Sequence, residues 1–469
     1  MSNSVTRTMA LPGITADAPD EASPRYAGWR VVAACFVVAM FCWGFGLYSH
    51  GIYLTELHRL RGWSASSISA ATTAYYLLTA FLVVFISDAI ARLGPRAVLL
   101  VGACCLVASV ALLAFVGALW QLYAAYLVMA VGSAAMHIGS ITNILGLWFD
   151  RQRGLAISLA LNGASSGGIL VAPALVLAIG AAGFTPAMVG ASIIMAAILT
   201  PVIATCVDRP PQRARAALAT PDLIRGSGQR GPSTSARAIA RQKTRVNALV
   251  HSPDAGSSAR LPSAPHGEPA SAPATPAWTR SKALRSPAFW SVAAPFALAL
   301  MAQVGFLVHQ IALLEPSIGR TAAGLAVAVL TVAAVIGRLL LGAFNLRLDL
   351  RWVAALLLLS QAAALFGMTQ TTNAAHLFIA CAVFGLSAGN LMSLPAMIVQ
   401  REFEAPSFGL LIGLSTAIGQ FIYAFGPGLL GVVRDATGSY VAPLMLCMAL
   451  EIAAAGLVLS PRFSGSRPI

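Results

Sequence analysis

The sequence predicts an all-α integral membrane protein of twelve transmembrane helices, arranged as two pseudo-symmetric six-helix bundles. Only 10% of its 469 residues are charged and 58% are apolar, whereas soluble domains average about 25% charged and roughly 45–50% apolar residues. Apolar runs of about 20 residues, long enough to span a bilayer as helix, recur along nearly the whole chain. Such long runs do not fit the alternating pattern of about ten residues that is typical of a membrane β-barrel.

The apolar runs form two groups of six, separated by a long polar stretch. They begin near Val31, Ser67, Ala97, Gln121, Leu155 and Ala187, and then near Phe289, Ala322, Trp352, His376, Phe408 and Val441. The stretch between the groups is rich in Pro, Ser, Ala and Arg, a composition that buries too little apolar surface to fold alone. We therefore expect a disordered N-terminal tail (1–27), a first bundle (28–207), a disordered basic linker (208–286), a second bundle (287–460) and a C-terminal tail (461–469).

The basic residues of the loops predict how the chain lies in the membrane. Most of them fall in the linker and in the connections on the same side of the membrane, such as Arg151 and Arg401, while the opposite side has fewer, such as Arg59 and Arg434. Because cytoplasmic loops carry the excess of Arg and Lys, we expect both termini in the cytoplasm. The abundance of Arg and Ala over Lys indicates a GC-rich bacterial genome, and hence a multi-pass protein of the bacterial inner membrane.

An internal repeat relates the two halves. One constant offset places Arg92 on Arg347, Arg96 on Arg351, and the pair Gly154-Leu155 on Gly409-Leu410. Parallel repeats of six helices are related by an axis along the membrane normal, and they place a substrate site between the halves near the bilayer midplane.

Arg338 is the strongest candidate for substrate binding. It lies well inside the eighth apolar run, with no acidic residue within one helical turn. An ionised side chain at such a depth costs about 2.5–3.5 kcal/mol on insertion scales, and a guanidinium presents paired donors that match the two oxygens of a carboxylate. The structural alternative is an arginine that reaches the membrane surface or bonds helix carbonyls.

Other polar side chains inside the apolar runs complete the candidate site. The candidates for proton coupling are His309, His50, His137 and Glu451, since imidazole titrates near neutral pH and a buried carboxyl can carry a proton. The alternatives are neutral histidines bonded to carbonyls and a protonated glutamic acid that packs. The candidate substrate-binding set is Arg338, His309, Tyr48, Asn162, Asn390 and Gln420; the amides have the alternative role of linking helices.

Several motifs together resemble the major facilitator superfamily and, within it, the monocarboxylate porters and oxalate/formate antiporters. They are Leu93-Gly94-Pro95-Arg96, the segment Trp148 to Ala156, His309, Gly337-Arg338-Leu339, and the segment Asp435 to Tyr440. The resemblance covers 28–460 apart from the linker. It implies alternating access, a substrate carboxylate on Arg338, and cytoplasmic gating by Asp88, Arg92, Arg96, Asp150, Arg153, Arg347 and Arg351.

The sequence departs from the family pattern at positions that bear on coupling. Ser87 and Ala91 replace the Gly and Asp of the usual cytoplasmic motif, although Asp88 lies one turn away. Ala334 stands where monocarboxylate transporters carry an Asp, and Ile418 stands where oxalate-type antiporters carry a Lys. The absence of this second cation disfavours a dicarboxylate.

These patterns predict a monomeric secondary transporter of a small organic anion such as a monocarboxylate, working by proton symport or exchange. An alternative is an exporter of amphipathic drugs or metabolites, whose greasy cavity is lined by Trp43, Phe45, Tyr75, Tyr76 and Tyr423. A membrane-embedded enzyme or sensor is disfavoured, because the sequence has no paired carboxylates, HExxH motif or Ser/His/Asp set. We expect no cofactor, no metal site and no nucleotide, since no phosphate-binding loop occurs, and no nucleic acid, since the basic residues lie in loops.

Overall fold

The computed structural model describes Glu21, Ser23 and residues 25–207, 278–344, 349–403 and 407–463, and these contain helices and no strand. Eleven helical segments are long and apolar enough to cross a membrane, and the shorter apolar helix Ala374–Ala388 occupies the tenth position. This arrangement confirms the predicted fold class. The expectations for residues 1–20, 208–277 and 464–469 lie outside the described residues.

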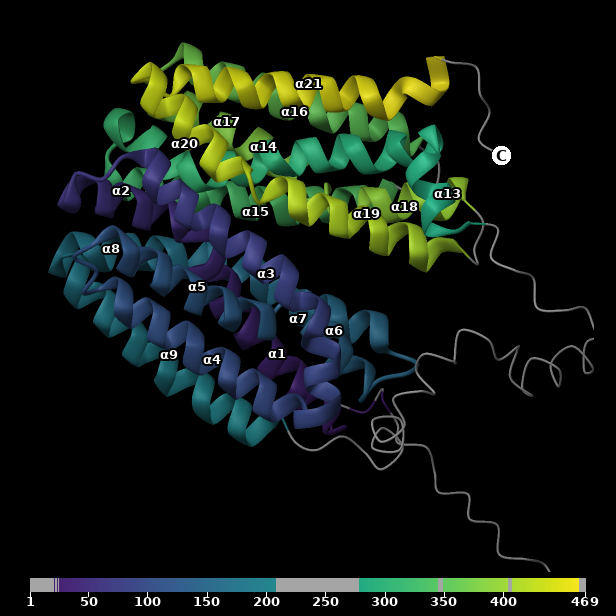
Figure 1. The fold of residues 1–469 in the computed structure, drawn as a ribbon, viewed down its shortest axis with the longest axis horizontal. Coiled ribbons are helices and arrows are strands. Elements are labelled where there is room, and N and C mark those ends of the chain that lie inside the picture. The colour runs from purple at the N-terminus through teal and green to yellow at the C-terminus, as the bar shows by residue number, and fades with distance from the viewer. Residues whose placement is uncertain are drawn as a thin grey trace, which may run out of the picture.

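The helices fall into two bundles (Figure 1). The first contains α1 (Gly28–Trp43), η1 (Gly44–Tyr48), α2 (His50–Arg61), α3 (Ala65–Leu93), α4 (Pro95–Leu113), α5 (Leu119–Ala135), α6 (Ile138–Gly146), α7 (Arg153–Ser166), η2 (Gly167–Val171), α8 (Ala172–Ala182) and α9 (Phe184–Cys206). The second contains α13 (Arg280–Arg285), α14 (Pro287–Ile318), α15 (Arg320–Phe344), α16 (Leu350–Gln370), α17 (Ala374–Ala388), α18 (Leu394–Glu402), α19 (Phe408–Tyr423), α20 (Gly426–Thr437) and α21 (Val441–Phe463).

The repeat seen in the sequence recurs in the packing of each bundle. Gly167 in η2 lies against the backbone carbonyl of Met40 in α1, and Gly426 in α20 lies against the carbonyl of Met301 in α14. A Cβ at either glycine would overlap the carbonyl oxygen, so both contacts require a residue without a side chain. The first and fifth spans of each half therefore meet backbone to backbone.

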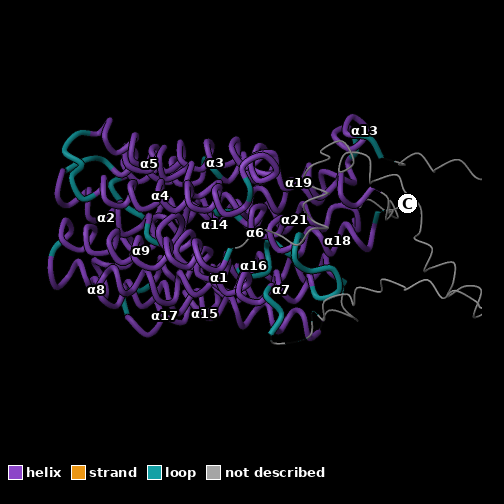
Figure 2. Tube along the Cα trace, turned by 90° about the horizontal axis from the view of Figure 1, so that it is seen from below, coloured by secondary structure: helices purple, strands orange, loops and turns teal. Residues whose placement is uncertain are grey.

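The two bundles meet at one end of the molecule and separate toward the other (Figure 1). Contacts between the halves join α3 to α20, α2 to α14 and α8 to α15. In the turned view, α2 and α8 lie at one end of the elongated molecule, and α13 and α18 lie at the other (Figure 2). We call the end with α2 and α8 the closed end, and the end with α13 and α18 the linker end.

Part of the segment expected to be a linker forms a helix in the structure. Residues 280–285 form α13, where the Thr279 hydroxyl accepts a bond from the Lys282 N–H and Ala283 is buried. Trp278 packs edge-on against Phe403 of the second bundle, with ring centroids 5.3 Å apart. Composition averaged over the linker hides this short apolar contact, which is why the sequence did not predict the helix.

Candidate functional site

A cavity of about 300 Å³ lies between the two halves. Its lining comes from α1, η1, α3, α5 and α6 in the first half and from α14, α18 and α19 in the second. None of the described residues that line it is Asp, Glu, Lys or Arg. The cavity therefore offers a ligand mostly apolar and aromatic surface, with few polar groups to orient it.

Four of the five aromatic residues expected in a greasy cavity line this space, namely Trp43, Tyr75, Tyr76 and Tyr423. Tyr76 and Tyr423 come from opposite halves and meet edge to face, with ring centroids 5.5 Å apart. The fifth, Phe45, is buried and stacks on Phe41 instead. A flat apolar ligand would thus touch aromatic groups of both halves.

Two predicted polar candidates also line the cavity. Gln420 is half-buried on α19. The ring of His137 stacks on Trp43 with centroids 5.6 Å apart, and its buried Nδ1 has no hydrogen-bond partner among the described residues. Both can contribute a hydrogen bond to a ligand.

Arg338 does not belong to the described lining of the cavity but crosses the interface between the halves. Its Nη2 donates to the Ser165 hydroxyl, on α7 of the other half, at 2.5 Å. No carboxylate of the described residues forms an ion pair with it. The side chain is exposed and has an electrostatic interaction with Tyr48. The guanidinium therefore keeps most of its donors available to an anion.

The other polar candidates are scattered. Tyr48 lies in η1 beside Gly168 and Thr331, again at the interface of the halves. Asn162 is exposed on α7 and is not among the described residues that line the cavity. Asn390 is buried after α17, and its Nδ2 donates to the Leu386 carbonyl. Of these three, Tyr48 is the one with an electrostatic interaction with Arg338, and Asn162 lies one helical turn before Ser165, the hydrogen-bond partner of Arg338.

His50 and Glu451 are buried inside separate halves. The ring of His50 lies among four tyrosines, and its Nδ1 is 3.5 Å from the hydroxyl of Tyr76. Glu451 is fully buried in α21, which packs on α14 and α16, and neither carboxyl oxygen has a described partner. Neither side chain lines the described cavity.

His309 lies at the interface of the halves near the closed end. Its Nε2 is 3.1 Å from the Ser69 hydroxyl of the first half and 3.1 Å from the Pro427 carbonyl of the second. Its Nδ1 is 3.4 Å from the hydroxyl of Tyr440. The side chain is only 2% exposed. A change in its protonation would therefore act directly on a contact between the halves.

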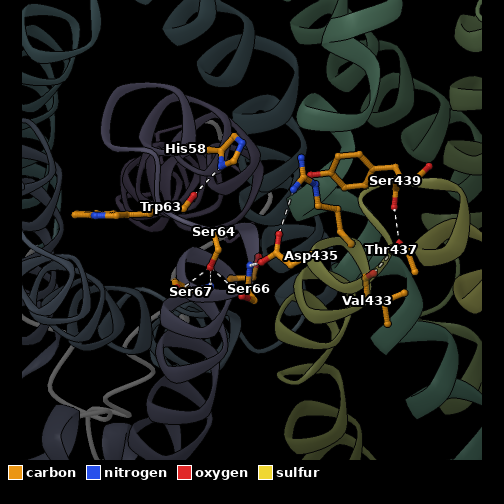
Figure 3. A network of polar contacts seen from close by, with 12 residues as sticks. His58, Trp63, Ser64, Ser66, Ser67, Val433, Asp435, Thr437 and Ser439 are labelled. Carbon is orange, nitrogen blue, oxygen red and sulfur yellow. Dashed lines mark hydrogen bonds and ion pairs between the residues drawn. The ribbon is translucent and has the colours of Figure 1, made fainter.

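Two further contacts join the halves at the closed end. The carboxylate of Asp435 in α20 accepts a hydrogen bond of 2.7 Å from the Ser66 N–H in the first turn of α3 (Figure 3). The buried carboxylate of Glu56 in α2 pairs with Arg320 of the second half and with Arg59 of its own half, each at 2.7 Å. The Asp435–Ser66 bond and the Glu56–Arg320 pair must both break if this end opens.

None of the described ion pairs joins a residue expected to gate the linker end to the opposite half. Asp88, Arg92, Arg96, Asp150 and Arg153 are exposed. Arg347 lies outside the described residues. Arg351 is buried and serves its own half: its guanidinium binds Glu402 in α18 at 2.7 Å and the Val458 carbonyl in α21 at 2.6 Å. It therefore joins helices within the second bundle.

Comparison with known proteins agrees with this architecture. The sequence model of the Major Facilitator Superfamily matches residues 32–427. The chain belongs to this superfamily. The eleven described helices that are long and apolar enough to cross a membrane agree with a multi-pass membrane protein. The crystal structure of the nucleoside transporter NupG shares the fold, with a TM-score of 0.63 at 13% identity, covering 94% of this chain and 99% of that one.

Relatives in the superfamily match only parts of the chain. The uncharacterized MFS-type transporter YcxA of Bacillus subtilis (strain 168) is 27% identical over 40% of this chain and 46% of its own length. A Thauera aromatica protein named as an anionic 4-hydroxy-benzoate permease is 33% identical over 23% and 65%. Monocarboxylate transporter 3 of Rattus norvegicus is 30% identical over 29% and 28%. The matches span less than two thirds of each of these relatives.

Proposed function

We propose that this superfamily member is a secondary active transporter of a small organic monoanion such as a monocarboxylate, working by alternating access with proton symport or exchange. We further propose that it lies in a bacterial inner membrane with both termini in the cytoplasm. In that orientation the linker end faces the cytoplasm, and the described conformation is open inward.

The single observation that carries the proposal is Arg338. It is a cation in a membrane span, it reaches across the interface that alternating access must rearrange, and it pairs with no described carboxylate. An unpaired arginine at this depth is costly unless it serves a ligand. The names of two relatives, an anionic 4-hydroxy-benzoate permease and monocarboxylate transporter 3, support an anionic substrate.

The test begins with purified protein and a panel of carboxylates that includes benzoate, 4-hydroxybenzoate and lactate. A ligand that binds the folded state raises the unfolding temperature, and the carboxylate with the largest shift is then followed as radiolabelled uptake into proteoliposomes. Arg338→Ala should weaken binding by about 10- to 150-fold, since a hydrogen bond to a charged group contributes about 1.5–3 kcal/mol.

The matched control is Arg285→Ala. It removes an exposed arginine of α13, at the linker end, that forms none of the contacts between the halves described above. Uptake by this variant should equal that of the wild type. Uptake of the same carboxylate by Arg338→Ala at the wild-type rate would refute the assigned role of Arg338.

A second candidate function, export of amphipathic compounds, is favoured by the uncharged aromatic lining of the cavity. Burial of apolar ligand surface against such walls stabilises a complex without any charge on the ligand. The two functions differ in their response to one variant: binding of a neutral aromatic compound should be unchanged in Arg338→Ala, whereas binding of a carboxylate should weaken by the factor given above.

A further inference from the structure

A second cavity lies between the halves at the closed end. Its volume is about 220 Å³, and α2 and α3 of the first half and α14 and α20 of the second contribute to its lining. Its ionisable groups are His58, Arg59, Glu315, Arg434 and Tyr440. We call this cavity the vestibule. It is charged where the central cavity is uncharged.

Tyr440 is the residue that connects the vestibule to His309. Its side chain lines the vestibule, and its hydroxyl lies 3.4 Å from Nδ1 of His309, which is almost completely buried. The guanidinium of Arg434 sits 5.7 Å from the centre of the Tyr440 ring and pairs with Asp435. The ring is thus held in place by a cation–π contact, with its hydroxyl directed at the imidazole.

The partners of His309 determine which nitrogen carries the proton when the ring is neutral. The Pro427 carbonyl can only accept a hydrogen bond, so Nε2, which faces it at 3.1 Å, must be the protonated nitrogen. Nδ1 is then the acceptor, and the phenol of Tyr440 must donate to it. The free lone pair of the buried histidine therefore points at the hydroxyl of Tyr440, a residue that lines the vestibule.

We propose that the hydroxyl of Tyr440 passes protons between the vestibule and Nδ1 of His309. In the forward step a hydronium ion of the vestibule gives a proton to the phenol oxygen while the phenol proton moves to Nδ1. Tyr440 ends neutral, a water molecule remains, and His309 carries one positive charge. The role of this relay in transport rests on the proposed function. The positive charge on a protonated His309 would change the strength of the contact between Nε2 and the Ser69 hydroxyl, which joins the halves.

The surrounding charges fit such a relay. Asp435 and Arg434 of α20 both interact electrostatically with His309, while α3 contributes only the neutral Ser69 hydroxyl. Arg59 and His58 of α2 and Glu315 of α14 face the vestibule. Burial raises the pKa of Tyr440 to about 12, so the phenol keeps its proton at neutral pH and acts by exchange rather than by ionising.

The test follows the N–H groups of His309 by solid-state NMR of protein labelled with ¹⁵N-histidine in lipid bilayers. The signal is assigned by its loss in His309→Gln, and it should show the tautomer protonated at Nε2 at high pH. At a lower pH that protonates His309, its N–H signals should decay in D2O about 100-fold more slowly in Tyr440→Phe, since a positioned proton-transfer group contributes about 10²–10⁴-fold.

The matched control is Tyr123→Phe, which removes a hydroxyl that bonds the Ser67 carbonyl at the same end of α3 but does not contact His309. Its exchange rate should equal that of the wild type. Equal exchange rates in Tyr440→Phe and the wild type would overturn the relay, as would a neutral tautomer protonated at Nδ1. Because no substrate is needed, the result stands whether or not a carboxylate is transported.

Discussion

Asp435 holds the closed end together through the first turn of a helix in the opposite half. Two oxygens satisfy the exposed N–H groups there: the Ser64 hydroxyl accepts from Ser67, and the Asp435 carboxylate accepts from Ser66. When the closed end opens, the Ser64 bond remains within its own half, whereas the Asp435 bond must break. Substitution of Asp435 should therefore favour conformations that are open at this end.

The size of the shift follows from what each substitution removes. Asp435→Asn keeps an oxygen acceptor but loses the charge at the helix N-terminus, which contributes about 0.3–1 kcal/mol. Asp435→Ala also loses the hydrogen bond, and such capping losses cost about 0.5–2 kcal/mol. The open-to-closed ratio should rise by roughly two- to fivefold in the Asn variant and by roughly 2- to 30-fold in the Ala variant.

The assay is double electron–electron resonance between spin labels at Arg61→Cys and Ala436→Cys, two exposed positions in opposite halves of the closed end. The background should have Cys104, the exposed native cysteine, replaced. Thr437→Ala is the control, because the Thr437 hydroxyl bonds only the Val433 and Ser439 carbonyls of its own half (Figure 3). Identical distance distributions for wild type and Asp435→Ala, or an equal shift in Thr437→Ala, would refute the reasoning.

Two further predictions concern the linker end. Glu402→Gln leaves the buried Arg351 without its carboxylate, which should destabilise the protein by about 3–5 kcal/mol in thermal unfolding; Arg351→Met in the same chain should restore part of the loss, and an unchanged midpoint in Glu402→Gln would contradict this. Glu21 accepts bonds from the N–H groups of Asp150, Arg151 and Gln152, each at 2.9 Å. Burial alone would raise the pKa of Glu21, but these donors and Arg151 outweigh it, so its pKa lies below the ordinary value of 4.5. The stabilisation is therefore complete above pH 4.5 and is lost as the pH falls through the lowered pKa; Glu21→Gln should expose the three N–H groups to hydrogen exchange at pH 7 but differ little from the wild type in acid, and equal protection at pH 7 would contradict it.

The sequence predicted what depends on local composition and spacing. Hydropathy located the spans, and the repeat located their pairing into halves, because both signals belong to single segments of chain. The depth of Arg338 and of His309 followed from their place within those segments. Their positions at the interface in the structure agree with the expectation that polar groups at such depth face another part of the protein.

The sequence could not predict which side chains meet across the interface. Nothing in the sequence marks Glu56 as a candidate, and Arg320 resembles an ordinary loop charge, yet they pair between the halves. Asp435 stood in a family motif without an evident role. Asn162 fits the polar pattern of a lining residue, and the structure places it exposed on α7, outside the described lining of the central cavity. Which face of a helix meets its neighbour depends on the packing of the whole bundle. The residue type at a single position does not reveal it.

The glycine contacts inside the halves separate two kinds of sequence change. Within a half, helices meet through backbone, as at Gly426 and Met301 or at Gly337 and Leu386, so nearly any added atom there forces helices apart. Between the halves the backbone approaches are looser, since a Cβ at Gly431 would lie 3.0 Å from the Ala65 carbonyl and one at Gly51 would lie 3.0 Å from the Val308 carbonyl. Side-chain pairs there, such as Glu56 with Arg320, can part and meet again without altering either bundle. We therefore expect mutations inside a half to lower the yield of folded protein, and mutations between the halves to change the rate of transport. Expression level and transport rate then report separately on these two kinds of contact.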